Sequence, residues 1–493
     1  MLLTKTEPAT HGQRIFCLSF IIKEKRKALK RIKTDIFGKN MKNIEKYKKM
    51  IQWGSTVVNV SLLTAAFAAV WYIFYSNEIV LPFYRKGNWM VIGIYAVITL
   101  IFNKVYGSYN VGYLRKTEAF YSQIISAFVV NIIEYCQISV IGRTFMGFIP
   151  IAFLTLIDII ILLLWTLIYG RIYSCLYPPR KMIIVYGSKK AGNLVLKMCQ
   201  RMDKYIISES VSADEPLDII EEKISGYNGV IICDVHDKLR NDILKYCFDR
   251  SIRVYLSPKI SDILVRGAQE INLFDSPLLL FRNDGLAFES RLLKRAFDIT
   301  FSLILLPVLL PFMGIVAIVV KLYDGGPVIY KQERLTINGK RFNVLKFRSM
   351  IADAEKDGLA RLSTDSDDRI TPVGAFLRKC RLDELPQFFN ILKGDMSFVG
   401  PRPERPEIAE QYEVEMEEFS FRLTVKAGLT GYAQIMGKYD TTPYDKLKMD
   451  LMYIEKFTVM NDIKILFMTL KIMIFPGKTN EGENILNINN PEK

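Results

Sequence analysis

Residues 382–392 read LDELPQFFNIL, in which two adjacent carboxylates stand directly before a proline and an apolar run. The proline and the apolar run predict a helix with Asp383 and Glu384 in its first turn. Acidic side chains often occupy a first turn only because they complement the helix dipole. Here, however, several cations flank the pair, namely Arg378, Lys379, Arg381, Arg402 and Arg405. We therefore interpret Asp383 and Glu384 as a catalytic pair, since a carboxylate can act as a nucleophile and can also bind Mg²⁺.

The scarcity of histidine supports this interpretation. The chain has two histidines, His11 and His236, and neither lies in a motif. Ser-His-Asp, Cys-His and HExxH chemistries are thereby excluded, and acid–base work falls to Asp, Glu, Lys or Tyr. The seven cysteines include no C-x-x-C pair and indicate neither a zinc site nor a disulfide framework.

Residues 341–350, RFNVLKFRSM, alternate as a strand does. The alternation places Lys346 and Arg348 on one face, where two cations would clamp a phosphate. A solvated strand face is the alternative. The aromatic Phe342 and Phe347 around the two cations favour the phosphate site.

An apolar run over residues 292–321 precedes these motifs. It contains Lys294, Arg295 and Asp298 near its start and Pro307 and Pro311 near its middle. The run is long enough to cross a bilayer as a helix. A crossing would place everything after residue 321 on the opposite side of the membrane.

Residues 180–285 predict a Rossmann-like α/β domain, because short apolar runs such as MIIVY (182–186) and GVIICD (229–234) alternate with helical stretches. Its first turn, from Gly187 to Gly192, has Lys189 where the central glycine of GxGxxG belongs. We therefore expect a structural or weakly ligand-sensing module more than a dinucleotide site.

Four apolar stretches, at about residues 54–75, 89–106, 119–141 and 149–170, predict four transmembrane helices within residues 51–175. Basic residues in the N-terminus, in the loop between the second and third stretches, and after Arg171 place the N-terminus and the rest of the chain in the cytoplasm. Glu134 and Asp158 lie inside the third and fourth stretches. A buried polar contact between helices is favoured for them over a proton or substrate path.

Composition is consistent with a membrane protein that also has water-exposed domains. The chain has 493 residues, 50% hydrophobic and 24% charged, with a net charge of +15. That charge suits anionic lipids or phosphates, whereas no base-stacking motif supports nucleic acid as a partner. Residues 1–50 form a basic segment in which Met41 is an alternative start, and residues 479–493 form a polar tail.

With these motifs in hand, the chain resembles the bacterial sugar transferase family, the monotopic polyprenyl-phosphate phosphoglycosyl transferases. The resemblance rests on KR..D from Lys294, the proline-broken apolar run, GPVIYKQER, KFRSM, LDELPQ, GDMSFVGPRPE and GLTG.AQ. The whole chain is similar to the long form of the family. That form has four membrane helices and a Rossmann-like domain before an α/β monotopic catalytic domain, which here covers residues 290–478.

The resemblance implies a reaction and its residues. Asp383 would attack the β-phosphate of a UDP-sugar, release UMP and pass the phosphosugar to undecaprenyl phosphate, with Glu384 as acid–base or metal-assisting partner. Lys346, Arg348, Arg402 and Arg405 would bind phosphates, and Asp383 and Glu384 would hold Mg²⁺. UDP-glucose or UDP-galactose would be the donor, in the initiation of exopolysaccharide, capsule or O-antigen synthesis.

The resemblance also implies a topology. The run over 292–321 would be a re-entrant helix broken at Pro307, which keeps the catalytic domain on the cytoplasmic face of the bacterial inner membrane. The stretch from Tyr444 to Phe475, with lysines between apolar residues, would lie on the membrane surface among its lipids. A homodimer is compatible with the resemblance.

Two departures from the family pattern affect loop geometry or sugar preference more than the nucleophile. Lys426-Ala427 stands where Lys-Pro is usual, and Cys380-Arg381 stands where Thr-Ser is commoner. The alternative function is a non-catalytic, nucleotide-sensing scaffold of a polysaccharide assembly complex. The intact acidic pair, KFRSM and PRP favour the enzyme.

Overall fold

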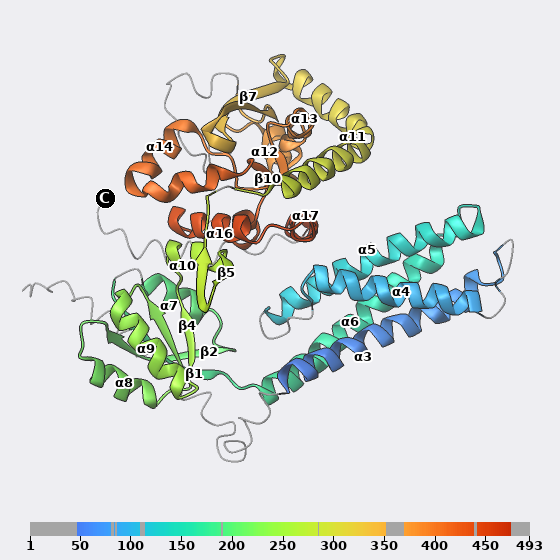
Figure 1. The fold of residues 1–493 in the computed structure, drawn as a ribbon. Coiled ribbons are helices and arrows are strands. Elements are labelled where there is room, and N and C mark those ends of the chain that lie inside the picture. Colours follow the sequence, from blue (N-terminus) through green and yellow to red (C-terminus); the bar gives the residue numbers. More distant parts are fainter. Residues whose placement is uncertain are drawn as a thin grey trace, which may run out of the picture. The chain divides into compact units, whose positions relative to one another are not determined.

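The computed structural model describes residues 47–79, 83, 86–108, 114–188, 191–283, 285–351, 369–437 and 441–474. The basic N-terminal segment up to residue 46, with Met41 and His11, and the polar tail lie outside them. The chain divides into two compact units at Ser257/Pro258. Figure 1 shows the elements of each unit.

Four long helices in the first unit correspond to the four predicted transmembrane stretches. They are α3 (Lys48–Val70, continued by a π-helical turn Trp71–Tyr75), α4 (Lys86–Val105), α5 (Lys116–Gly142) and α6 (Ile149–Leu176). Each is long and apolar enough to cross a membrane. Their outward side chains, such as Ile73, Val97, Phe128 and Leu164, are apolar and exposed, as expected for a surface that faces lipid.

The four helices run up and down, and lysines from three of them lie at the same end of the bundle. Lys48 at the start of α3 lies over the rings of Tyr173 and Tyr177 near the end of α6. Lys116 at the start of α5 lies against Gly170, also near the end of α6. We call this end, which also carries Lys104 in the last turn of α4, the basic end of the bundle.

The predicted parallel α/β domain follows. Strands β1 (Arg180–Tyr186), β2 (Tyr205–Ser212), β3 (Gly229–Cys233) and β4 (Arg253–Leu256) form a parallel sheet of order β2-β1-β3-β4. Helices α7 (Ala191–Cys199), α8 (Leu217–Ser225) and α9 (Asp237–Asp249) connect the strands. At Gly187 a Cβ atom would lie 2.1 Å from the carbonyl oxygen of Asp234. This glycine therefore permits the close approach of the loops after β1 and β3, whether or not a ligand binds there.

The second unit contains the acidic pair and the cationic motifs in a small α/β core. Two-stranded ladders β7 (Ile329–Leu335) with β8 (Arg341–Phe347), antiparallel, and β9 (Ser397–Val399) with β10 (Gly428–Thr430), parallel, form its centre. Around them lie α12 (Pro372–Lys379), α13 (Gln387–Lys393), α14 (Pro406–Glu415), α15 (Tyr432–Met436), α16 (Pro443–Glu455) and α17 (Val459–Ile474). A short helix α10 (Ile260–Arg266) packs on α16 in a shared apolar cluster, and the hairpin β5 (Gln269–Leu273) with β6 (Ser276–Leu280) follows it.

Helix α11 (Phe288–Asp324) covers the predicted apolar run as one helix of 37 residues with Pro307 and Pro311 inside it. It is the fifth helix of the described residues that is long and apolar enough to cross a membrane. Figure 1 shows the helix changing direction along its length. Proline explains such a bend, because it removes a backbone hydrogen bond and its ring clashes with the preceding turn.

The KR..D motif fastens the first part of α11 to the core of this unit. Lys294 forms a buried ion pair with Asp462 of α17. Arg295 donates to the carbonyl oxygens of Ile391 and Leu392 at the end of α13, at 2.6 and 2.7 Å. Asp298 accepts from Ser397 Oγ and from the backbone N–H of Phe398 at 3.0 and 3.1 Å. These polar residues of an apolar helix thus serve as anchors for its position.

Candidate functional site

The acidic pair lies between two helices. Asp383 and Glu384 belong to a 3₁₀ turn, Leu382–Glu384, and Pro386 is the N-cap of α13. The prediction that the pair starts an α-helix was therefore wrong in detail. Arg381 enters the left-handed region with φ of 54°, which ends α12 and starts a separate tight turn before the helix that the proline permits.

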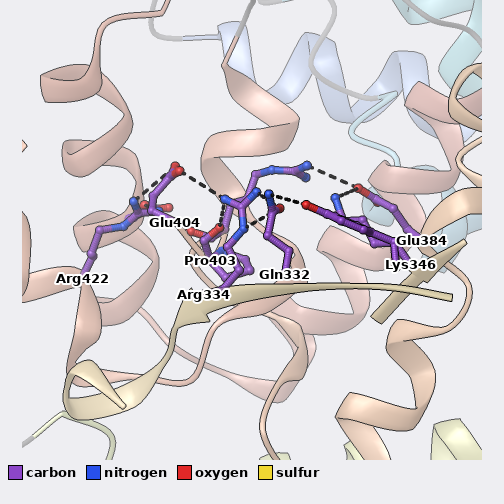
Figure 2. Close-up of polar contacts among 10 residues, drawn as sticks. Gln332, Arg334, Lys346, Glu384, Pro403, Glu404 and Arg422 are labelled. Atoms are coloured by element: carbon purple, nitrogen blue, oxygen red, sulfur yellow. Dashed lines mark hydrogen bonds and ion pairs between the residues drawn. The ribbon is translucent and has the colours of Figure 1, made fainter. Parts of the chain in front are cut away.

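Glu384 is the centre of a ring of cations. Its carboxylate lies 3.3 Å from Arg402 Nη2, 3.8 Å from Arg381 Nη1 and 4.0 Å from Lys346 Nζ. Figure 2 shows Lys346 and Glu384 reaching toward each other from a strand and a turn. Burial alone would raise the pKa of Glu384, but the three cations hold it below its ordinary value. Glu384 is thus an anion whose charge is already balanced.

Asp383 has a different environment although it is the next residue. Its side chain is buried, with 8% of its surface exposed, and no residue that the structure describes forms an ion pair with it. Burial and the adjacent charge of Glu384 raise its pKa above the ordinary value, while Lys346 and Arg378 oppose that rise. A carboxylate with a raised pKa and no ion pair among the described residues would be the better nucleophile of the two, because its electron pair is less stabilised by neighbouring charge.

Lys346 supplies the third charge of the site. It is the residue before the last of β8 and pairs in register with Tyr330 of β7. Burial and the neighbouring guanidinium of Arg402 lower the pKa of Lys346 to about 8, against the attraction of Glu384. A phosphate placed between Lys346 and Arg402 would relieve this repulsion, which is how a cation cluster gains affinity for a phosphate.

A second arginine, Arg334 of β7, extends the cationic cluster and was not among the predicted site residues. Its Nη2 and Nε donate to Gln332 Oε1 at 2.6 and 3.1 Å, and its Nη1 donates to the carbonyl oxygen of Pro403 at 3.1 Å. Burial lowers its pKa to about 10, and the charge of Arg402 contributes to that lowering. The QER of GPVIYKQER contains this residue, so the signal was present in a motif to which no role was assigned.

A chain of ion pairs continues from Arg334 to the far side of the GPRPE loop (Figure 2). Glu404 lies 3.8 Å from Arg334 and 3.7 Å from Arg422. Arg422 donates to the carbonyl oxygen of Arg402 at 2.9 Å and pairs with the buried Asp450 of α16 at 2.8 Å. These contacts hold the main chain at Arg402, so its side chain is directed toward Glu384. Arg422 and Asp450 were also missed, because neither lies near the acidic pair in sequence.

Two glycines let the main chain of this loop pack closely against a neighbouring segment. A Cβ atom at Gly428 would lie 2.1 Å from the backbone nitrogen of Gly400, and one at Gly400 would lie 2.4 Å from the carbonyl oxygen of Lys426. Only glycine lets the two main chains approach so closely. The VGPRP and AGLTG motifs therefore position Arg402 through their backbones.

The remaining predicted residues occupy other places. Arg348 follows the end of β8 and is buried, with its guanidinium against Gly326. Arg405 is the N-cap of α14, and its charge reaches Arg334. Pro307 lies within α11. The cations placed directly around Glu384 are therefore Lys346, Arg402 and Arg381.

Ser349 gives KFRSM a further role in the site. Its hydroxyl oxygen accepts a hydrogen bond of 2.9 Å from Arg378 Nε. Arg378 is one of the charges that lower the pKa of Asp383. The motif thus acts on the pair from two sides, through Lys346 and through the arginine that Ser349 orients.

The donor set can be tested against the expected Mg²⁺. Among the residues that the structure describes, no group of three or more His, Cys, Asp or Glu could hold a metal ion. Mg²⁺ is nevertheless commonly bound by one or two carboxylates together with substrate phosphates. Asp383, which forms no ion pair with the described residues, and the adjacent Glu384 fit that mode. The described residues do not form a site that encloses the ion with protein groups alone.

The chain is similar in sequence to known proteins. Residues 289–476 match the family model described as bacterial sugar transferase. The chain is 41% identical over 223 residues to a UDP-glucose:undecaprenyl-phosphate glucose-1-phosphate transferase of Escherichia coli, covering 44% of this chain and 45% of that protein. It is 39% identical over 211 residues to an undecaprenyl-phosphate galactose phosphotransferase of Salmonella typhimurium, covering 40% and 44%.

A third relative carries a different sugar in its name. The UDP-N-acetylgalactosamine-undecaprenyl-phosphate N-acetylgalactosaminephosphotransferase of Aeromonas hydrophila is 36% identical over 235 residues, covering 47% of this chain and 54% of that protein. The chain thus spans about half the length of these curated relatives. The match lies where the acidic pair, the cation cluster and α11 lie, and residues 289–476 of this chain belong to the bacterial sugar transferase family.

Proposed function

We propose that this protein transfers a sugar 1-phosphate from a UDP-sugar to undecaprenyl phosphate, through a phosphosugar bound covalently to Asp383. The observation that carries the proposal is the contrast within the acidic pair. Glu384 is neutralised by Arg402, Arg381 and Lys346, whereas Asp383 is buried without an ion pair among the described residues. The names of the relatives, which contain undecaprenyl phosphate and a nucleotide sugar or sugar, support the substrates.

The first step forms a bond between a carboxylate oxygen of Asp383 and the β-phosphorus of the donor. The bond from that phosphorus to the bridging oxygen breaks, and UMP leaves with the electron pair. Lys346 and Arg402 would hold the phosphate oxygens as charge develops on them. Mg²⁺ held by Asp383, Glu384 and the phosphates would offset the charge of the diphosphate.

The second step regenerates the enzyme. A phosphate oxygen of undecaprenyl phosphate attacks the phosphorus of the aspartyl ester, the bond to Asp383 breaks, and the carboxylate is restored. The product is a sugar linked to the lipid by a diphosphate. In this step Glu384 keeps Arg402 and Lys346 in place, because its charge pairs with both.

The position of α11 supports a re-entrant helix with the active site at the membrane surface. A helix of 37 residues would be about 55 Å long if straight, well beyond the roughly 30 Å hydrocarbon core. Yet both of its halves pack on apolar clusters of the same unit. Phe301, before Pro307, lies edge-to-face on Phe398, and Met313 and Val320, after it, pack with Phe347 and Leu377. A helix that returns to its own domain leaves that whole domain on one side of the membrane. We place it on the cytoplasmic side of the bacterial inner membrane.

The donor can be identified by a panel of UDP-sugars. Membranes that contain the full chain and undecaprenyl phosphate should release UMP with UDP-glucose or UDP-galactose more rapidly than with N-acetylated donors. Membranes with Asp383→Asn are the matched control, because the amide keeps the shape of the side chain. Equal UMP release in both preparations with every donor would contradict the proposed function.

A further inference from the structure

Buried polar side chains are distributed unevenly along the membrane bundle. Toward the basic end, the interior contains hydroxyl and amide groups, namely Thr56, Asn59, Thr99, Asn103, Gln123 and Ser126. Toward the other end, it contains apolar groups, namely Leu63, Phe67, Val70, Val91, Ile92 and Leu154. A polar side chain inside a membrane bundle costs free energy, and one that is kept there is often functional. The interior of the bundle thus carries more hydroxyl and amide side chains toward its basic end.

A small cavity marks the polar side. Thr56 and Asn59 of α3, Asn103 of α4, Gln123 of α5 and Trp165 of α6 line it, so every helix of the bundle contributes. Asn59 is 4% exposed and its Nδ2 has no hydrogen-bond partner within the described part of the chain. An unsatisfied donor at a polar cavity is a site for water.

Hydrogen-bonding groups lead inward from this cavity along α5. Ser126 lies one turn beyond Gln123, and Asn131 follows. Asn131 Nδ2 donates to Thr155 Oγ1 at 3.0 Å and to Asp158 Oδ2 at 2.9 Å. Tyr95 Oη donates to Asn131 Oδ1 at 3.3 Å. The column of polar groups therefore joins α4, α5 and α6 at Asp158.

Two acids stand at the inner end of this column. Glu134 of α5 and Asp158 of α6 are both 0% exposed. Within the described residues, neither carboxylate oxygen of Glu134 has a hydrogen-bond partner, and neither does Oδ1 of Asp158. Beside them, the ring of Phe67 stacks on that of Tyr95 at 4.2 Å between centroids.

We propose that Glu134 is a proton-binding site of the membrane bundle, reached by water from the basic end through this polar column. A carboxylate anion without a partner cannot be sustained in such an interior, whereas the neutral acid can. A metal cation would need several oxygens around it, but the two oxygens of Glu134 have none within hydrogen-bond distance among the described residues. Tyr95 of α4 is close enough to both acids to be affected by their charges, and neither Tyr95 nor Asp158 can supply a positive charge to Glu134.

A lipid-soluble carbodiimide distinguishes whether Glu134 binds a proton or a monovalent metal cation, because the reagent reacts with a neutral carboxylic acid in an apolar setting. Membranes with the full chain are treated in sodium-free and in sodium-containing buffer, and modified peptides are identified by mass spectrometry. We expect modification of Glu134 that decreases as pH rises and is the same in both buffers. Glu118, exposed in the first turn of the same helix, is the internal control and should not react.

Variants keep the test decisive. Glu134→Gln should lose the modified peptide, and Asp158→Asn should keep it. Glu134→Cys should react with a small water-soluble thiol reagent added to the basic-end side, which reports the water path. Failure of Glu134 to react with the carbodiimide, protection by sodium, or an unreactive Glu134→Cys would each overturn the proposal.

Discussion

Arg402 lies with Nη2 3.3 Å from Glu384 Oε1, while its own carbonyl oxygen accepts a hydrogen bond of 2.9 Å from Arg422. One residue therefore connects the acidic pair with a network of buried ion pairs behind the loop. The arrangement keeps a cation beside Glu384 before any substrate binds, whereas Asp383 forms no ion pair with the described residues. A cation that is already in place can stabilise the charge that develops on the phosphate oxygens without any rearrangement of the site.

The depressed pKa of Lys346 predicts how donor use depends on pH. Lys346 attracts phosphate only when protonated, and its pKa is lowered to about 8. For the donor, kcat/KM should therefore fall as pH rises through about 8, since this quantity reports ionisations of the free enzyme. Lys346→Arg keeps its charge at high pH and should move the fall to higher pH. The exposed Lys340→Arg is the matched control, and an unmoved fall in Lys346→Arg would rule out Lys346 as its source.

Breaking the ion pair behind Arg402 should cost both stability and activity. Arg422 and Asp450 have 7% and 2% of their side chains exposed, and removal of one partner from a buried pair typically costs about 3–5 kcal/mol. For Asp450→Ala we expect the lower figure, about 3 kcal/mol, because Glu404 still lies near Arg422. Denaturant unfolding in detergent measures it.

The matched control is Glu333→Ala, which breaks the exposed pair with Arg341 and should cost about 0–1 kcal/mol. Activity separates positioning from mere stability. If Asp450 acts through Arg402, then Asp450→Ala lowers donor affinity in the wild-type background and has little effect when Arg402→Ala is already present. Equal losses in both backgrounds would show a role in folding alone.

The close approach of two main chains predicts the effect of a single methyl group. In Gly428→Ala the new Cβ would lie 2.1 Å from the backbone nitrogen of Gly400. Overpacking of this kind costs about 1–3 kcal/mol, and the shifted loop would also displace Arg402. Gly314→Ala is the control, because nothing lies within 4 Å of its Cβ and alanine favours a helix. If thermal unfolding and UMP release are the same for Gly428→Ala and wild type, the glycine has no positioning role.

Topology gives a prediction for α11. Single cysteines at Glu289, in the first turn of the helix, and at Lys340, between β7 and β8, would both stand at exposed positions of the second unit. A helix that returns to its domain should leave both shielded from an impermeant thiol reagent in intact cells and reactive after lysis. Labelling of Lys340→Cys alone from outside would mean that α11 crosses the membrane.

The regular elements could be predicted from sequence because their signals are local. Apolar length predicts α3 to α6, and the alternation of strands such as MIIVY with helices predicts the parallel sheet. The 3₁₀ turn at Asp383 could not be predicted from these signals. A proline after an acidic pair fits a helix start equally well, and the left-handed Arg381 that separates the turn from α12 has no composition signal.

The candidate site was predictable where its residues share a motif. Asp383, Glu384, Lys346 and Arg402 come from dense motifs, and the fold brings them together. Arg422 comes from the 3₁₀ helix before β10, and Asp450 comes from α16. Their contact depends on tertiary packing over a long sequence separation, which periodicity does not report. The anchoring role of Asp298 was likewise hidden, since a carboxylate in an apolar run does not reveal its partner.

The central claim is that Asp383 carries the phosphosugar, and isotope exchange without acceptor tests it most directly. The full chain in detergent, with UDP-sugar and Mg²⁺ but no polyprenyl phosphate, should exchange radiolabelled UMP into UDP-sugar, because the first step is complete before the lipid reacts. Asp383→Asn should abolish the exchange. Glu384→Gln should retain a trace, since an assisting group typically contributes about 10² to 10⁴ in rate. Exchange that strictly requires the lipid acceptor, or that persists in Asp383→Asn, would contradict the covalent route.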